Sequence, residues 1–201
     1  MVTLKDIYDC SQLSIIPRSV HINKGVEIDY RLFQTITETG EGRSRDYKYD
    51  FDVFLPKYGF NLQRDYVWEH CQQQEFIMSL LLEKPIDPII IVEHITDRDH
   101  TDVIMSVIDG KQRLLTIKKF ANNEFSINIG GKDVYFNDFD DEAKRFFKSR
   151  VNYLTGTIYY SYPDEPITDD MKIALFNFYN FAGTPQAEEH KNKLQNILNN
   201  L

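Results

Sequence analysis

Cysteine is scarce in this sequence, and its two cysteines, Cys10 and Cys71, form no pattern. A single widely spaced pair supplies neither a disulfide framework nor the paired spacing of a zinc site. The five histidines show no HxxxH or HExxH motif, so the sequence predicts no structural metal centre. These absences argue against a small domain stabilised by disulfides or zinc.

Long apolar runs are also missing. No stretch reaches the roughly 18 apolar residues that a membrane span needs, and the first residues, MVTLKDIYDC, lack the apolar segment of a signal peptide. We therefore expect a cytoplasmic protein that does not contact a membrane.

Positive charge is in the minority, with 23 Lys and Arg against 31 Asp and Glu, a net charge of −8 and a pI of about 5.1. A basic surface over the whole body, as in many nucleic-acid binders, is therefore absent. Contact with a DNA backbone would need a local basic patch. The candidates are Lys144, Arg145, Lys148 and Arg150, extended by Arg43, Arg45 and Lys48. The alternative is an ordinary solvated helix face.

The chain is long enough for one domain with an N-terminal arm. Hydrophobic residues make up 42%, including 14 Phe and 12 Tyr, so a sizeable core is expected. We assign residues 1–46 to the arm, because 35–46 is polar and glycine-containing. Within the arm, VEIDYRLFQTI is compatible with a helix or a strand. Residues 47–201 form the predicted domain.

Hydrophobic periodicity predicts strands and helices in mixed order. Expected strands are 50–55, 89–92, 103–108 and 157–162, with a hairpin around Gly130-Gly131. Expected helices are 69–83, 111–122, 140–150, 168–180 and 187–198. Because strands and helices do not alternate strictly, the predicted class is α+β.

The segment Ile108-Asp109-Gly110-Lys111-Gln112-Arg113 leads from a buried strand into a helix. The free N–H groups and dipole of a helix N-terminus favour an anion, and Gly110 lets the backbone approach a ligand. Lys111 and Arg113 add positive charge. Arg113 shares a helical stripe with core residues, so we expect it to line a pocket and grip phosphate oxygens. The alternative is that Asp109 caps the helix and the cations are solvated.

Two further segments carry polar and aromatic residues at the borders of predicted helices. Gln63-Arg64-Asp65-Tyr66-Val67-Trp68 combines an arginine with two aromatics, Tyr66 and Trp68, which can stack on a base. These aromatics could instead be a hydrophobic staple. Asn180 ends a helix and is followed by Gly183-Thr184-Pro185, so an inward amide and a hydroxyl are available. A plain helix C-terminus is the alternative.

In this order, the motifs QRxYVW, IDGxQR and NxxGTP resemble the ParB/sulfiredoxin-like domain at the N-terminus of GmrSD-type modification-dependent restriction enzymes. That domain is also called the DGQQR-motif domain of unknown function. The resemblance covers about residues 50–190 and implies a small mixed sheet packed with helices. Lys111 stands where the family usually has glutamine, and Asp65 replaces a proline.

In that family the DGQQR segment binds and hydrolyses a nucleotide, which the resemblance transfers to positions 109–113. The implied catalytic residues are Asp109, Arg113 and Arg64, with Asp109 acting as a base or holding Mg²⁺. The implied nucleotide and phosphate contacts are Gly110, Lys111, Gln112, Gln63, Thr116, Asn180, Gly183 and Thr184.

We therefore expect a domain that hydrolyses or transfers a phosphoryl group from a nucleoside triphosphate, with Mg²⁺, in DNA restriction, modification or phage–host conflict. One alternative is a phosphotransferase acting on a hydroxyl of modified DNA. Another is a non-enzymatic inhibitor or adaptor that binds DNA or protein. A nickase using Glu69, His70 and Glu75 ranks below these.

Full-length relatives carry a helical second half and often an HNH nuclease, and no such cluster occurs in this sequence. The resemblance therefore implies DNA as a partner and a further protein that supplies a nuclease or effector function. A bacterial or phage-infected cell is the expected setting. The sequence gives no indication of oligomeric state.

Overall fold

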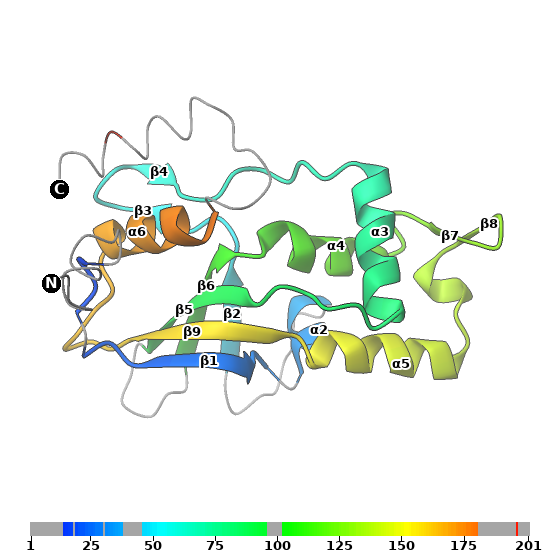
Figure 1. The fold of residues 1–201 in the computed structure, drawn as a ribbon, viewed down its shortest axis with the longest axis horizontal. Helices are drawn as coiled ribbons and strands as arrows, with labels where there is room; N and C mark the ends of the chain where they lie inside the picture. Colours follow the sequence, from blue (N-terminus) through cyan, green and yellow to red (C-terminus); the bar gives the residue numbers. More distant parts are fainter. Residues whose placement is uncertain are drawn as a thin grey trace, which may run out of the picture.

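A five-stranded mixed sheet forms the centre of the computed structural model, which describes residues 14–17, 19–29, 31–37, 46–95, 102–180 and 196 (Figure 1). The strands run in the order β1 (Ile22–Glu27), β9 (Thr155–Ser161), β5 (Ile89–Ile95), β6 (Asp102–Asp109) and β2 (Asp46–Asp50). Pairs β1–β9 and β5–β6 are antiparallel, and pairs β5–β9 and β2–β6 are parallel. The predicted α+β class is confirmed.

The central strand β5 explains the continuous apolar run in the sequence. Ile89 and Ile91 belong to one hydrophobic core, and Ile90 and Val92 belong to the other. Successive side chains of a strand point to opposite faces of the sheet, so a strand covered on both faces must be apolar at every position. The sheet is therefore the middle layer of the molecule.

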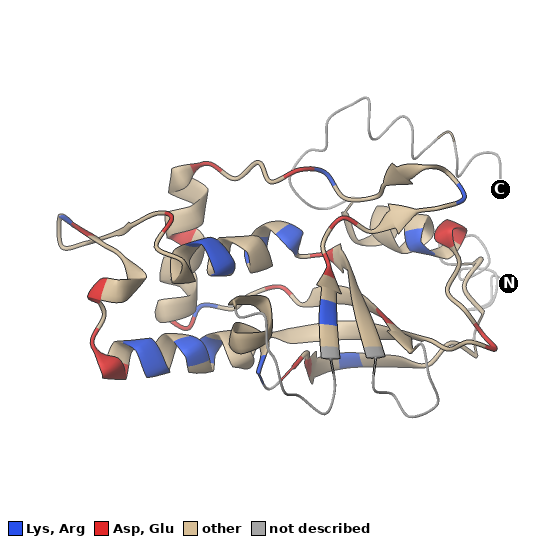
Figure 2. Cartoon of the chain, turned by 180° about the vertical axis from the view of Figure 1, so that it is seen from behind, with Lys and Arg blue, Asp and Glu red and all other residues tan. Residues whose placement is uncertain are grey.

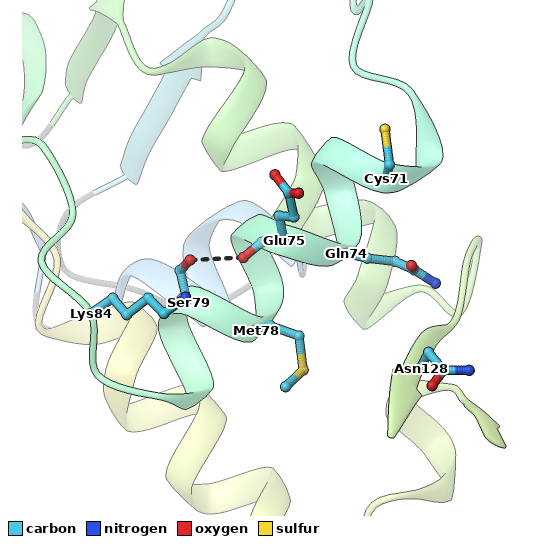
Figure 3. Close-up of a pocket in the computed structure, with 7 residues that line it drawn as sticks. All are labelled: Cys71, Gln74, Glu75, Met78, Ser79, Lys84 and Asn128. Carbon is cyan, nitrogen blue, oxygen red and sulfur yellow. Dashed lines mark hydrogen bonds between the residues drawn. The ribbon is translucent and has the colours of Figure 1, made fainter. Parts of the chain in front are cut away.

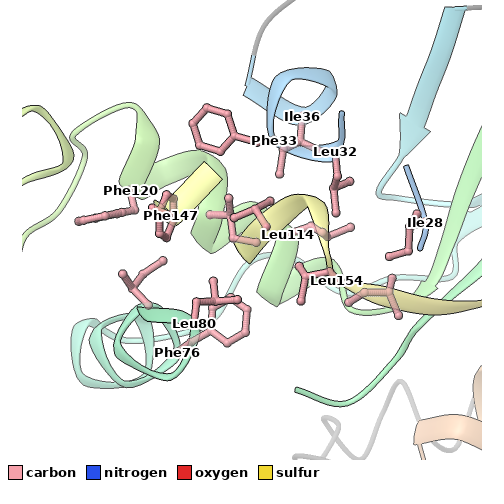
Figure 4. Packing of buried hydrophobic residues seen from close by; sticks show 14 of the residues in the cluster. Ile28, Leu32, Phe33, Ile36, Phe76, Leu80, Leu114, Phe120, Phe147 and Leu154 are labelled. Carbon is pink, nitrogen blue, oxygen red and sulfur yellow. The ribbon is translucent and has the colours of Figure 1, made fainter. Parts of the chain in front are cut away.

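Four helices build the first core on one side: α2 (Leu32–Thr37), α3 (His70–Leu81), α4 (Lys111–Ala121) and α5 (Asp141–Asn152). Phe120 of α4 lies near its centre, with ring centroids of Phe125 and Phe147 at 5.5 Å, and contributes to the packing drawn in Figure 4. Aromatic pairs at such distances add about 0.5–1.5 kcal/mol each beyond area burial. This core fixes the direction of α4.

Among the described residues, no helix has the length and apolar character needed to cross a membrane.

Helix α6 (Asp169–Asn180) covers the other core together with a short hairpin, β3 (Phe54–Leu55) and β4 (Phe60–Asn61). Lys57, in the hairpin turn, joins the two, because its backbone N–H donates to Asp169 at 2.9 Å and its ammonium contacts Asp170. A second hairpin, β7 (Ile127–Ile129) and β8 (Lys132–Val134), surrounds Gly130-Gly131 as predicted, and the 3-10 turn η1 (Phe136–Asp138) follows it.

The predicted strand 50–55 is wrong in its extent. Strand β2 ends at Asp50, whose carboxylate accepts hydrogen bonds from the backbone N–H groups of Asp52 and Val53. Such a side-chain bond competes with strand pairing and turns the chain. Val53 then adopts a positive φ of 52°, and only Phe54–Leu55 continue as a strand.

Part of the predicted N-terminal arm lies in the main sheet and its core. Strand β1 forms one edge of the sheet, and α2 buries Leu32, Phe33 and Ile36. The segment VEIDYRLFQTI thus begins as a strand and continues as a helix. The predicted helix 187–198 lies outside the described residues except for Asn196.

His94 on β5 is a half-buried histidine whose ring reaches into the interior. Its Nε2 atom is buried and makes no hydrogen bond. Burial, with a smaller contribution from the nearby positive charge of Lys172, lowers the pKa of His94 from 6.5 to about 4. The imidazole is therefore neutral in the folded protein at neutral pH.

The free energy of unfolding should consequently fall as the pH drops from about 6.5 towards 4, because over that range the unfolded chain binds a proton that the folded chain rejects. The loss approaches about 3 kcal/mol below pH ~4. Urea denaturation of the wild type and of His94→Phe across this range measures it. The variant should lose less stability than the wild type, and identical pH slopes for the two proteins would contradict the assignment.

Candidate functional site

A cavity of about 660 Å³ opens where the end of β6, the first turn of α4, the chain before α3 and the end of α6 meet. Figure 1 shows the C-terminal end of α6 beside the start of α4. The cavity is lined by Gln63, Arg64, Trp68, Phe76, Pro85, Ile86, Asp87, Pro88, Ile90, Asp109, Gly110, Lys111, Gln112, Arg113, Thr157, Tyr179 and Asn180. Parts of all three sequence motifs therefore lie on one cavity.

Gly110 makes the turn from β6 into α4. It is the N-cap of α4 with a φ of 109°, a region that only glycine adopts readily. A Cβ atom built there would lie 2.5 Å from Cδ1 of Ile89, so close packing also requires glycine. Helix geometry leaves the N–H groups of the first turn without intrahelical acceptors, and residues 111–113 of that turn line the cavity.

Arg113 lies in the first turn of α4, and 13% of its side chain is exposed. One amino group donates to Asp109 Oδ2 at 2.7 Å and to the carbonyl of Pro88 at 3.4 Å, and the other donates to the carbonyl of Asp87. These bonds use three of the five N–H donors of a guanidinium. The expectation that Arg113 borders the core and lines a pocket is confirmed by its position.

Asp109 carries a perturbed carboxyl group. Burial raises its pKa above the ordinary value, the Arg113 guanidinium and the Gly110 N–H oppose that rise, and the charge of Asp87 adds to it. A raised carboxyl pKa inside a cavity is typical of functional acids and bases, although structural ion pairs show it as well.

Lys111 is placed differently from a simple phosphate-binding cation. Its side chain is only 6% exposed, and its ammonium contacts Asp52 Oδ1 at 2.6 Å. Because a buried ammonium needs a carboxylate partner, Lys111 joins the start of α4 to the turn that follows β2. Asp52 was not predicted as part of the site.

Two glutamines of the motifs bind backbone groups across the cavity. Gln112 accepts a hydrogen bond from Val67 N–H at 2.9 Å and donates to the carbonyl of Asp65 at 3.0 Å. Gln63 donates to the carbonyls of Val107 and Ile108 at 2.7 and 2.6 Å. The two side chains therefore hold the segment 63–68 against β6 and α4.

Two residues predicted to contact the nucleotide are absent from the cavity wall. Thr116 is fully buried, and its hydroxyl lies 2.7 Å from that of Tyr66. The ring of Tyr66 instead lies beneath the ammonium of Lys119, 5.2 Å from the ring centroid. Trp68 does line the cavity and packs edge-on against Phe76, so it serves both the core and the cavity wall.

The third motif is described only at Asn180. Its side chain lines the cavity and donates to the carbonyl of Phe176 at 2.9 Å. Gly183 and Thr184 lie outside the described residues. Asp87, Thr157 and Tyr179 complete the wall and were not predicted. Asp87 stands between two prolines, which is the one signal in the sequence that could have drawn attention to that loop.

The predicted basic cluster does not adjoin the cavity. Figure 2 shows Lys and Arg gathered on α5, away from the first turn of α4. Lys144 donates to the carbonyl of Asn137 at 3.1 Å, and Arg150 pairs with Glu83 at 3.0 Å. Arg145 and Lys148 line a separate hollow. Arg43 and Arg45 lie outside the described residues.

A further hollow of about 440 Å³ runs along α3 and contains no residue of the three motifs (Figure 3). Glu75 lies there, whereas Glu69 caps α3 and His70 contacts the carbonyl of Ser126. The three candidates for a nickase thus have separate roles. Among the described residues, no group of three or more His, Cys, Asp or Glu could hold a metal ion.

A family model described as the GmrSD restriction endonuclease, N-terminal domain, matches residues 43–201. The match therefore includes the whole cavity lining and starts after β1 and α2. Comparison with curated proteins and with solved structures found no match.

Replacing Gly110 by alanine should destabilise the fold by more than about 2 kcal/mol, because it adds a contact with Ile89 to an unfavourable φ. Gly25→Ala is the matched control, since Gly25 also has a positive φ, 66°, but open space around its Cβ position. Chemical denaturation of both variants measures the difference. Equal losses would show that the approach of Ile89 is unimportant.

The Lys111–Asp52 pair should appear as a coupling energy. Asp52→Ala leaves a buried ammonium without its partner and should cost more stability than Asp52→Ala in a Lys111→Met background. Four proteins in a double-mutant cycle, unfolded with urea, provide the test. Additive losses would contradict a structural role for this pair.

Proposed function

The chain belongs to the family of GmrSD restriction endonuclease N-terminal domains, and from this premise we propose that its cavity binds a nucleoside triphosphate and hydrolyses or transfers the terminal phosphoryl group. The observation that carries the proposal is the joint position of Arg113, Asp109 and the start of α4 on one cavity. Its volume of about 660 Å³ lies in the range of small-molecule sites.

The geometry of the first turn of α4 supports the proposed phosphate binding. The exposed N–H groups and the helix dipole favour an anion at this point. Arg113 is held at its edge by Asp109 and by two carbonyls, so its charge is oriented before a ligand arrives. Arg64 lines the same cavity and supplies a second guanidinium. Preorganised cations of this kind stabilise the charge that develops during phosphoryl transfer.

Asp109 is the proposed base. In hydrolysis it would accept a proton from the attacking water while the bond between the terminal phosphorus and its bridging oxygen breaks. Its raised pKa suits that task, because a base with a very low pKa accepts a proton poorly. Gln63, Gln112 and Lys111 act as positioning residues in this proposal, since their polar ends hold neighbouring segments in place.

Mg²⁺ fits the carboxylates on the cavity wall. Asp87 and Asp109 both line the cavity, and Mg²⁺ beside phosphates commonly uses one or two carboxylates with several waters. When bound, the ion would neutralise part of the phosphate charge.

Membership of the family supports a restriction or phage-defence setting for the proposed activity. In this proposal its partners are DNA and a further protein or domain that acts as the effector. Transfer to a hydroxyl of modified DNA is the variant of the same chemistry. A non-enzymatic inhibitor or adaptor is the second candidate, favoured by the structural use of Lys111, Gln63 and Gln112. In that case these residues would maintain the fold without turnover.

Thermal unfolding with ATP, GTP, CTP or UTP and Mg²⁺ tests binding, because a nucleotide at about 100 times its Kd stabilises the folded state by roughly 2.7 kcal/mol. Release of inorganic phosphate, with and without DNA, tests turnover. We expect at least one nucleotide to raise the melting temperature. No shift and no phosphate release with all four would refute the proposal.

Arg113→Ala should remove turnover, by at least about 100-fold, because a preorganised cation is lost. Asp109→Asn should retain nucleotide binding and the shape of the side chain but lose turnover. Lys132→Ala removes one positive charge from the exposed β7–β8 hairpin and is the matched control. Full turnover by Arg113→Ala together with an unchanged nucleotide-induced shift would contradict the role proposed for Arg113, whereas a nucleotide-induced shift without phosphate release by the wild type would favour the adaptor.

A further inference from the structure

The hollow that Arg145 and Lys148 line has a volume of about 370 Å³ and lies at the C-terminal end of α5. It shares no lining residue with the proposed nucleotide cavity. It is lined by Glu27, Arg145, Lys148, Ser149, Asn152 and Tyr153. Asn152 accepts a hydrogen bond from the Phe33 N–H at 2.9 Å, which ties this wall to α2. The hollow is therefore bounded by secondary structure on more than one side.

Only part of the basic cluster on α5 serves this hollow. Lys144 and Arg150 are engaged with Asn137 and Glu83, as described above. Arg145 and Lys148 are exposed and both line the hollow. On a chain with a net charge of −8, the two cations that line this hollow concentrate positive charge locally and favour an anion.

The aromatic residue beside these cations is unusually exposed. Tyr153 is the C-cap of α5 and has 59% of its surface accessible. Phe146, on the same helix, is 40% exposed. Exposed aromatic rings next to Lys and Arg are the combination that single nucleic-acid strands use, because bases stack on the rings while phosphates contact the cations.

Glu27 distinguishes a nucleotide from a simple phosphate. Its carboxylate lines the same hollow and would repel a phosphate placed beside it. A carboxylate accepts hydrogen bonds from the exocyclic amino groups of bases, as it does from cytosine N4. An acidic peptide would likewise be repelled by Glu27, so the lining favours a nucleobase over a second acidic group.

We propose that this hollow binds one unstacked nucleotide of a single DNA strand. Arg145 and Lys148 contact the phosphates, Tyr153 stacks on the base, and Glu27 accepts a hydrogen bond from the base amino group. The site is distinct from the proposed nucleoside triphosphate cavity and does not depend on turnover there. It gives the domain a contact with unpaired DNA.

Fluorescence anisotropy with labelled 12-nucleotide oligomers of dA, dC and dT tests the proposal, with a duplex, an RNA strand and a labelled glutamate-rich peptide as the other arms. Wild-type protein should bind the oligomers of dA and dC more tightly than that of dT, the duplex or the peptide. Arg145→Ala and Lys148→Ala should each weaken binding. Each should also reduce the slope of log binding constant against log salt concentration by about 0.7 in magnitude. Lys132→Ala, with the same charge change, should leave both nearly unchanged.

Three further variants test the base contacts. Tyr153→Ala should weaken binding by about fivefold or more, whereas Tyr153→Phe keeps a stacking ring and should retain most of the affinity. Glu27→Gln should reduce the preference for amino-bearing bases, because an amide can donate as well as accept. Melting temperatures of all variants identify any that fail to fold. The conservative substitutions Tyr153→Phe and Glu27→Gln test the same contacts if a more disruptive variant does not fold.

The proposal is overturned by absent single-strand binding, by equal effects of Arg145→Ala and Lys132→Ala, or by tighter binding of the duplex, the RNA strand or the peptide. A peptide bound in preference to DNA would assign the hollow to a protein partner. Each of these outcomes is independent of nucleotide turnover, which is measured at the other cavity.

Discussion

Two glutamine amides hold together the walls of the cavity at the start of α4. Gln112 binds backbone groups of the segment 63–68, and Gln63 binds the carbonyls at the end of β6. That segment lies outside the regular strands, and at one end the Gln63 N–H donates to the carbonyl of Asp52. The glutamine side-chain bonds therefore help to determine where Arg64 and Trp68 lie. The cavity is thus a product of reciprocal bonding between two sequence motifs, and neither motif forms its wall alone.

Charge in the cavity is balanced locally by carboxylates. Arg113 is paired with Asp109, and Lys111 with Asp52. A phosphate bound as proposed would compete with these existing partners for the cations, inside a partly buried space where electrostatic interactions are strong. The two pairs differ in kind. Arg113 is planar with several donors and can serve two acceptors together, whereas the ammonium of Lys111 is a compact charge committed to one carboxylate.

The sequence was sufficient to predict elements whose side chains follow a strong periodic pattern, such as β5, α4 and α6. The resemblance also implied that residues of the three motifs serve one site, and parts of the first two motifs and Asn180 of the third do line one cavity. The sequence was insufficient at Asp52 and Asp87, because their importance comes from contacts across the fold: the ammonium of Lys111 in one case and the guanidinium of Arg113 in the other. Thr116 and Tyr66 are the opposite case, because both were predicted to contact a ligand and neither lines the cavity. Their residue types suited a ligand, and helix packing directed them towards each other.

Strand β1 lies before the region shared with the family, and it pairs with β9, which is 137 positions away at Ile22 and Tyr159 (159 − 22). During synthesis, β1 leaves the ribosome early and must wait for most of the chain before its partner exists. Contacts between such distant segments form slowly. Until then β1 has no strand to pair with. Once β9 has been synthesised, it can pair with β5 before β1 pairs with it. We therefore expect β1 to join the sheet late, although it is the first strand encoded among the described residues.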